Sequence, residues 1–345
     1  ARPGRGGAPR RGCVVVDVVC ASLNPVDAKY LLGDKLPAAL DALLGRRLVE
    51  GQGVGFDFAG VVASAAVGTG FQVGDRVFGT TPIGVASIAD QVATPAHQVA
   101  AMPRALSFAE AAALPLVGLT ALQIFRRNGL CEGQRLLLLG AGGGVGHVAL
   151  QVARALGARV TAVAGAASAD LATKLGAEHV LDYTQGADKL QAAIAALAAE
   201  RPFDLCLDTV TSADDRDRAS GYPALVAAAR SPAGDGAAAL KGRYVNIGGR
   251  LGDWLRAAAR KVCGLDAFPK ERELFWIRFP ETSGELAELA AMAERGVLRP
   301  VVAHEVAFKT AAIADACEEL LGRRVKGKLV VRVREDPRET NSSFG

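Results

Sequence analysis

The chain has 345 residues, half of them hydrophobic and 22% charged, and its formal net charge is +4. This is enough apolar material for about two domains with buried cores. The positive residues are scattered, so the small basic excess gives no indication of nucleic-acid binding. No apolar run reaches about 18 residues, so we expect no membrane span.

The cysteines indicate a reducing compartment. Six occur and no two form a CxxC pair, while Cys13, Cys20 and Cys206 lie in apolar, strand-like runs. We interpret them as small buried hydrophobes. The first 12 residues are basic and lack an acid, which predicts the tail of a transit peptide or, as we prefer, a loop before the first strand. The compartment is therefore unknown: the cytoplasm, or a chloroplast or mitochondrion if a transit peptide was lost.

The first hundred residues contain several short stretches that predict strands. Residues 13–20 are dense in β-branched side chains, and further strands are expected at 55–62 and 74–79. Residues 22–27 (SLNPVD) predict a turn, because Pro25 disfavours a helical conformation of the residue before it. This spacing predicts an all-β, partly barrel-like domain.

Helices and strands alternate from about residue 104. Residues 108–125 have helical spacing that Pro115 and Gly118 interrupt. The following strands are apolar without alternation, which is typical of a parallel sheet covered on both faces by crossover helices. The strands are expected at 136–139, 159–163, 180–183, 205–209, 244–247 and 273–279, and the helices at 145–156, 168–175, 188–199, 224–229 and 284–294. We predict an α/β fold with a doubly wound Rossmann domain.

The chain becomes β-like again after Pro300, with strands at 301–308 and 328–333 and a helix between them at 313–321. We expect these strands to complete the first, mostly β domain, with the Rossmann domain inserted in it. The predicted boundaries are residues 1–105 and 297–335 for the mostly β domain, 106–296 for the Rossmann domain and 336–345 for a disordered tail.

A glycine-rich turn lies between an apolar strand and a helix. Residues 141–146 fit the pattern A-x-G-x-x-G, and the turn contains Gly142, Gly143, Gly144, Val145 and Gly146. A pyrophosphate can approach bare backbone amides closely, and a helix N-terminus adds donors and a partial positive charge. We predict a dinucleotide site here; the alternative is a tight turn without a ligand.

The end of the second strand of the predicted Rossmann domain, residues 159–163, indicates whether the cofactor is NAD or NADP. An NAD site places an acid there to bind the ribose 2′-hydroxyl, but residues 162–168 (AVAGAAS) contain none. Asp170 comes later, in a helix whose N-cap we expect to be Ser168. Because a 2′-phosphate would meet no carboxylate at the strand end, we predict NADPH. The same segment offers no Arg or Lys to pair with that phosphate.

These motifs, taken together and in order, resemble the quinone-oxidoreductase branch of the medium-chain dehydrogenase/reductase superfamily. The glycine turn and residues 165–183 are most similar to chloroplast-envelope quinone oxidoreductase homologues, and residues 202–210 to a mitochondrial reticulon-interacting relative. The matching segments are SLNPVD (22–27), GFDFAGVV (55–62), VGDRVFG (73–79), AAALPLVGLTAL (111–122), GGGVG (142–146), LGAEHVLDY (175–183), PFDLCLDTV (202–210) and GKLVVRV (327–333).

The resemblance implies a GroES-like catalytic domain, a Rossmann domain and an active site in the cleft between them. It also implies strands upstream of residue 13, so we expect the chain to be truncated at its N-terminus. Many members are homodimers, which makes a homodimer an expectation here.

The resemblance further implies a protein without zinc. Zinc-dependent relatives hold the metal with cysteine, histidine and a further cysteine or acid. Their cysteine falls at or beside Asn24, and their Gly-His-Glu motif falls at residues 55–57 (GFD), so neither ligand is present. The structural four-cysteine loop is missing too, and the four histidines are isolated in the sequence.

Without a metal, we expect NADPH to deliver hydride to an already electrophilic quinone or α,β-unsaturated carbonyl. Asn24 matches the family's active-site asparagine and would donate to the developing oxyanion; the alternative is an Asx-turn before Pro25. Lys29 falls where some relatives carry an active-site tyrosine, and would stabilise the oxyanion or relay a proton. The alternative for Lys29 is a solvated surface lysine.

Further cofactor contacts are implied by the resemblance. Thr120 matches a threonine near the cofactor, and Tyr183 a tyrosine near the adenosine phosphate; helix packing and core packing are the alternatives. Val210 and Gly248 follow later strands and would face the nicotinamide, because ligands lie at the carboxyl ends of parallel strands. Ser168 completes the predicted set.

Two other functions stay open. An enoyl-thioester reductase would need a basic cleft, which Arg250, Arg256, Arg260 and Lys261 could supply. A non-catalytic NADPH-binding sensor or scaffold would bind the cofactor without turnover.

Overall fold

In this computed structural model, the structure describes residues 9–32, 54–82, 85–211, 240–248, 272–275 and 282–336. Contacts divide the chain into two compact units, one of Ala1–Leu119 with Arg278–Gly345 and one of Thr120–Ile277. These boundaries differ from the sequence-based ones because α4 (Phe108–Ala112) packs on strands of the first unit and α12 (Ser283–Glu294) packs on β5 (Val99–Ala101).

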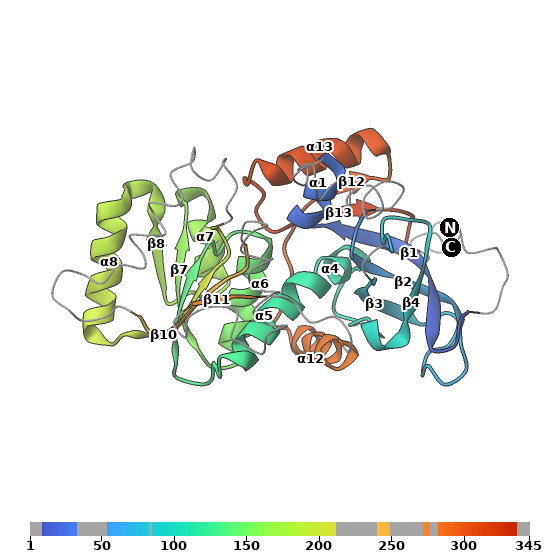
Figure 1. Ribbon diagram of the computed structural model, residues 1–345, viewed down its shortest axis with the longest axis horizontal. Coiled ribbons are helices and arrows are strands. Elements are labelled where there is room, and N and C mark those ends of the chain that lie inside the picture. Colours follow the sequence, from blue (N-terminus) through green and yellow to red (C-terminus); the bar gives the residue numbers. More distant parts are fainter. Residues whose placement is uncertain are drawn as a thin grey trace, which may run out of the picture. The chain divides into compact units, whose positions relative to one another are not determined.

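The first unit contains a seven-stranded sheet in the order β12-β13-β1-β2-β3-β5, with β4 also paired to β1 (Figure 1). All its pairs are antiparallel except β12 with β13. Its remaining strands are β1 (Cys13–Leu23), β2 (Asp57–Ala65), β3 (Arg76–Thr80), β4 (Gln91–Pro95), β12 (Val302–Ala307) and β13 (Lys328–Arg332). The pairing of Leu23 with Leu329 joins the two ends of the chain in one sheet, which confirms the predicted inserted architecture.

Alternation along β1 builds the core of this unit. Val14, Val16 and Val18 are buried beside Phe58 and other apolar side chains from β2, β3 and β4. A second cluster gathers Leu23, Leu329 and Cys317 where α1 (Pro25–Leu32) contacts α13 (Thr310–Leu321). Truncation of a fully buried leucine such as Leu329 would cost about 2–5 kcal/mol.

Two local expectations in this unit were wrong. Residues 22–27 do not form a turn: β1 continues to Leu23 and α1 begins at Pro25. Proline is favourable at the first helical position, where its missing N–H would have no partner. Helix α5 (Pro115–Arg127) also continues through Gly118. A Cβ at Gly118 would lie 2.7 Å from Leu289 Cδ1, so this glycine makes room for α12.

The second unit contains a six-stranded parallel sheet in the order β11-β10-β9-β6-β7-β8. This is the doubly wound Rossmann order. The strands are β6 (Arg135–Leu139), β7 (Arg159–Ala164), β8 (His179–Asp182), β9 (Phe203–Asp208), β10 (Leu240–Asn246) and β11 (Arg272–Leu274). The helices described between these strands are α6 (Gly144–Ala155), α7 (Ala166–Lys174) and α8 (Ala187–Glu200). Described 3-10 turns lie at Tyr183–Gln185 and, in the first unit, at Ala96–Gln98.

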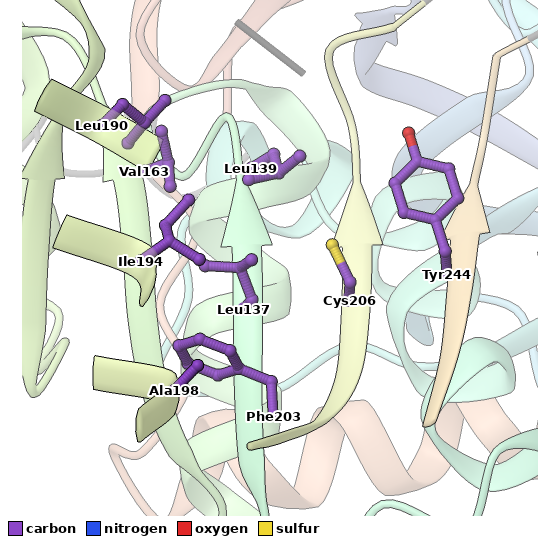
Figure 2. Close-up of a cluster of buried hydrophobic side chains, with 9 residues drawn as sticks. All are labelled: Leu137, Leu139, Val163, Leu190, Ile194, Ala198, Phe203, Cys206 and Tyr244. Atoms are coloured by element: carbon purple, nitrogen blue, oxygen red, sulfur yellow. The ribbon is translucent and has the colours of Figure 1, made fainter. Parts of the chain in front are cut away.

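One face of this sheet packs on α8. Figure 2 shows Leu190, Ile194 and Ala198 of α8 facing Leu137, Val163 and Phe203 of the strands. The apolar strands without alternation thus became a sheet with a buried core, as predicted. The helix expected at 224–229 and most of the predicted tail lie outside the described residues. No helix in the described ranges combines the length and the apolar character that crossing a bilayer requires.

Candidate functional site

The loop from β6 to α6 needs glycine at several positions for packing. A Cβ at Gly146 would lie 2.1 Å from the carbonyl oxygen of Gly140. A Cβ at Gly142 would lie 2.5 Å from Ser168 Cβ, and one at Gly140 2.5 Å from Val210 Cγ2. Gly140 also has φ +85°, which favours glycine. The structure therefore brings the glycine turn, Ser168 and Val210 into contact.

The N-terminus of α6 is the open part of this loop. Gly143 is the N-cap, and a Cβ there would meet nothing nearer than the Gly140 oxygen at 3.5 Å. Gly143, Gly144 and Val145 are partly exposed. The first N–H groups of a helix have no partner within the helix, and the helix dipole adds partial positive charge. Bare amides with open space before them fit a pyrophosphate.

The end of β7 differs from the prediction that Ser168 caps the following helix. Helix α7 begins at Ala166 with Gly165 as its N-cap, so Ser168 lies in the first turn and is not the cap. Gly165 has the extended backbone, φ −79° and ψ 160°, that an N-cap requires. The Tyr183 hydroxyl oxygen lies 3.1 Å from where a Gly165 Cβ would be, so the Tyr183 ring covers this strand end.

An acid lies close to this strand end, on the neighbouring strand. Asp182 ends β8 and pairs with Ala164 of β7. Its Oδ1 accepts hydrogen bonds from the Thr184 hydroxyl at 2.7 Å and the Thr184 N–H at 2.9 Å. These bonds, with a smaller contribution from the Ala166 N–H, lower the pKa of Asp182. Residues 162–168 alone could not reveal this carboxylate, because it comes from another strand.

Asp208 organises the ends of β9 and β10. Its Oδ1 accepts from the N–H groups of Val210 at 2.8 Å and Thr211 at 2.9 Å. Its Oδ2 accepts from the Tyr244 hydroxyl and, at 3.4 Å, from Asn246 Nδ2. Figure 2 shows the Tyr244 hydroxyl directed toward the carboxyl ends of these strands.

The same network reaches the segment after β10. Asn246 Oδ1 accepts from the Gly248 N–H at 2.6 Å. Asp208 therefore holds the predicted residue Val210 directly and the predicted residue Gly248 only through Asn246. The sequence reasoning missed Asp208, although its signal is present as an aspartate that ends an apolar strand.

In the first unit, Asn24 lies in a buried polar cluster. Its side-chain Nδ2 donates to Asp57 Oδ2 at 2.9 Å, and its Oδ1 accepts from Lys328 Nζ. Asp57 Oδ2 also accepts from the Ser22 hydroxyl at 2.8 Å, and Asp57 Oδ1 from the Leu116 N–H at 2.8 Å. Asn24 is 2% exposed.

Lys328 brings a positive charge into this cluster. It begins β13, is 3% exposed, and its Nζ lies 3.6 Å from Asp57 Oδ2. Nζ also donates to the carbonyl oxygen of Leu23 at 3.0 Å. Burial lowers the pKa of Lys328, while Asp57 and Asp27 act in the opposite direction. No sequence argument singled out this lysine, because its partners lie some 300 positions away.

Asp27 lies in the first turn of α1. Its Oδ2 accepts from the Asn24 N–H at 2.8 Å and its Oδ1 from the Gly55 N–H at 2.9 Å. Burial raises the pKa of Asp27 to about 7, and the neighbouring charge of Asp57 adds to the rise. Lys29 is in α1, but its side chain lies outside the described residues. Thr120 is buried in α5.

The donors of this cluster do not suit a metal. Within the described ranges, no group of three or more His, Cys, Asp or Glu side chains is placed to hold an ion. The buried carboxylate of Asp57, which accepts from the Asn24 side chain, is already paired with an ammonium, which opposes the binding of a second cation. Cys20, Cys206 and Cys317 are buried, and burial raises the pKa of Cys20 to about 12 and that of Cys317 to about 11.

Comparison with known proteins adds to this geometry. The family model "Alcohol dehydrogenase GroES-like domain" matches residues 10–104, and "Zinc-binding dehydrogenase" matches residues 144–222. The human mitochondrial NAD(P)H oxidoreductase RTN4IP1 is 29% identical over 93% of this chain and 81% of its own length. A trans-enoyl reductase, pgmF, of Aspergillus terreus is 30% identical over 93% of this chain and 86% of its own.

A solved structure shares the fold as well. The quinone oxidoreductase of Thermus thermophilus, which was also solved in complex with NADPH, is 28% identical with a TM-score of 0.64. The match covers 94% of this chain and 93% of that one.

Proposed function

Because the chain belongs to the medium-chain dehydrogenase/reductase superfamily, in its quinone oxidoreductase branch, we propose that this oxidoreductase uses NADPH to reduce quinones or α,β-unsaturated carbonyls without zinc. The single observation that carries the proposal is the open, amide-lined N-terminus of α6, where Gly143 leaves space in front of bare N–H groups. A quinone oxidoreductase with an NADPH complex among its structural relatives supports the choice of cofactor.

Each predicted residue has a role in this proposal. The turn of Gly142, Gly143, Gly144, Val145 and Gly146 holds the pyrophosphate. The N–H groups of Gly144, Val145 and Gly146 in the first turn of α6 are the donors, whereas the Gly143 N–H already donates to the Gly140 carbonyl at 3.1 Å. Ser168 and Tyr183 flank the adenosine ribose at the end of β7. Thr120, Val210 and Gly248 line the nicotinamide side. When bound, the nicotinamide supplies the hydride.

The preference for NADPH is the finer part of the proposal. The end of β7 itself carries no acid, and Ser168 offers a hydroxyl in the first turn of α7. Asp182 opposes this preference, because its carboxylate lies on the adjacent strand end and would repel a 2′-phosphate. Asp182→Asn should therefore strengthen NADPH binding relative to NADH. Fluorescence titration with both cofactors measures the ratio, and tighter binding of NADH by the wild type would refute the NADPH assignment.

Asn24 is the proposed donor to the acceptor's oxygen. An amide nitrogen carries two hydrogens, and the bond to Asp57 uses one of them. Because Asn24 is nearly buried, it can serve only an acceptor that docks directly against it. Lys29 stays a second candidate for stabilising the oxyanion or relaying the proton that must follow the hydride.

We propose the absence of zinc because of the side chains that surround Asn24. The carboxyl groups described around Asn24 are already engaged: Asp57 pairs with Lys328, and Asp27 accepts two backbone hydrogen bonds and has a pKa raised by burial, which opposes their use as metal ligands. Elemental analysis of the purified chain should find less than about one zinc per ten molecules. Stoichiometric zinc that resists dialysis against a chelator would refute this part.

The experiment that tests the function is loss of NADPH absorbance with a panel of quinones, short enals, long-chain enones and enoyl-CoA. We expect turnover of quinones or enones, and Asn24→Ala should lower kcat about 100-fold while NADPH binding is kept. Turnover only with enoyl-CoA would favour an enoyl-thioester reductase, which the similarity to a trans-enoyl reductase supports. The basic residues of this chain that could bind the CoA phosphates in that case, Arg250, Arg256, Arg260 and Lys261, lie outside the described residues. NADPH binding without any turnover would favour a sensor or scaffold.

A further inference from the structure

The ammonium of Lys328 is a buried charge that the proposed function does not yet use. It comes from β13, which pairs with β1 so that Leu23 faces Leu329. This pairing places Nζ against the Asn24 side-chain oxygen and 3.6 Å from Asp57 Oδ2. Lys328 is thus the residue through which the C-terminal segment reaches the Asn24 amide.

Charge decides which way the Asn24 amide points. An asparagine side chain can be turned so that its oxygen and nitrogen exchange places, and hydrogen bonding selects one orientation. An ammonium only donates and a carboxylate only accepts. Lys328 therefore requires the Asn24 oxygen on its side, and Asp57 requires the nitrogen on its own side.

Asp57 is itself held in place, so it acts as a fixed reference. Its two oxygens accept from the Ser22 hydroxyl and the Leu116 N–H in addition to Asn24. With both neighbours fixed, the reversed amide would set oxygen against carboxylate and nitrogen against ammonium. Each reversed contact is repulsive, and burial removes the water that would screen it.

We propose that Lys328 is a positioning residue for reduction: its ammonium locks and polarises the Asn24 amide, so that the remaining N–H is presented as a donor to the oxygen of the acceptor. This inference rests on the proposed function, in which Asn24 is that donor. Withdrawal of electron density from Oδ1 by the ammonium strengthens the opposite N–H as a donor. Lys328 touches neither acceptor nor cofactor in this scheme and acts only through Asn24.

The test is a double-mutant cycle with the full chain, NADPH and 1,4-benzoquinone. Lys328→Met keeps the length of the side chain but removes the donor, and should lower kcat about tenfold with the KM for NADPH within about twofold. In the Asn24→Ala background the same substitution should change kcat less than about twofold, because the amide through which it acts is gone. A purely structural lysine would give losses that multiply in the double variant, and that result would overturn the inference.

The outcomes separate the two proposals. If Asn24→Ala leaves kcat unchanged, the donor role fails first and the inference falls with it. If Asn24→Ala lowers kcat but Lys328→Met acts equally in both backgrounds, only the inference fails. If Lys328→Met does not fold, Lys328→Arg goes through the same cycle, since any effect of the arginine must also vanish without the amide.

Thr94→Val is the matched control for buried polar loss. The Thr94 hydroxyl is fully buried in the same unit and donates to the Thr80 carbonyl at 3.0 Å, with no bond to the cluster. It should lower the midpoint of thermal unfolding without the loss of kcat that Lys328→Met causes. An equal loss of kcat in Thr94→Val would show that destabilisation alone explains the effect.

Discussion

Asp27 shows how burial changes a single residue. It is 1% exposed, accepts two backbone hydrogen bonds and has a pKa raised from 3.8 to about 7. Between these values the unfolded chain has released the proton while the folded chain retains it. Stability from this group is therefore greatest at low pH and falls as the pH rises toward 7.

We predict that Asp27→Asn removes this pH dependence. The difference in unfolding free energy, wild type minus variant, should fall by on the order of 1 kcal/mol per pH unit between roughly pH 4 and 7 and level off above. Urea unfolding at pH 5, 6, 7 and 8 measures it. Asp182→Asn is the control, because the pKa of Asp182 is lowered and its stability contribution is lost only in acid. A constant difference for Asp27→Asn across this range would contradict the prediction.

Single residues also mark what the sequence could and could not reveal. Asn24 was singled out because the SLNPVD segment is recognisable by itself, and its role in reduction stays a prediction. Lys328 and Asp208 were missed because their importance lies in partners from other strands, and a local pattern shows no partner. Ser168 was found as part of a short segment but misplaced at the helix end, because Gly165 adopts the cap conformation without a side chain.

At the scale of elements, the glycines of the loop before α6 have two different roles: some are needed for packing, and others leave space for a ligand. Gly146 lies where a Cβ would strike backbone, 2.1 Å from an oxygen, whereas Gly143 has ordinary contact distance at 3.5 Å. Two alanine substitutions in one loop therefore have different physical meanings. One tests the fit of α6 against the strand end, and the other tests the space in front of the helix.

We predict that Gly143→Ala weakens NADPH binding at least about tenfold, equal to about 1.4 kcal/mol, with less than about 1 kcal/mol of lost stability. Gly146→Ala should instead lose about 1–3 kcal/mol of stability through overpacking. Fluorescence titration and urea unfolding of both variants distinguish the effects. Unchanged affinity in Gly143→Ala would place the pyrophosphate elsewhere.

Apolar runs located the long elements well, and both sheets contain the strands expected from them. The short strands β4 and β5 were not predicted, since three to five residues carry too little periodicity. The break expected at Gly118 failed for a different reason. Glycine is required at position 118 because a Cβ there would collide with Leu289 on α12. A rule based on neighbouring residues in the sequence cannot include this contact.

For the whole molecule, a bound cofactor must raise the free energy of unfolding by an amount that grows with the logarithm of its concentration relative to its dissociation constant. NADPH at about 100 times its dissociation constant should add about 2.7 kcal/mol to the unit that binds it. We predict a higher midpoint of thermal unfolding with NADPH and a smaller shift with NADH at equal concentration. At the same NADPH concentration, tenfold weaker binding leaves Gly143→Ala about half of this stabilisation, about 1.4 kcal/mol, or less. An equal shift in that variant would contradict the assignment of the turn.

The pairing of β1 with β13 has a consequence for synthesis on the ribosome. The Rossmann unit is continuous from Thr120 to Ile277, so its strands emerge in one stretch. The other sheet must leave Asn24 and Asp57 without their lysine until β13 is translated, because Lys328 arrives some 300 codons later. Its closure depends on contacts of very long sequence separation, which form slowly. The nascent chain thus carries a finished nucleotide fold and an unfinished second sheet, and the emergence of β13 is the event that completes that sheet.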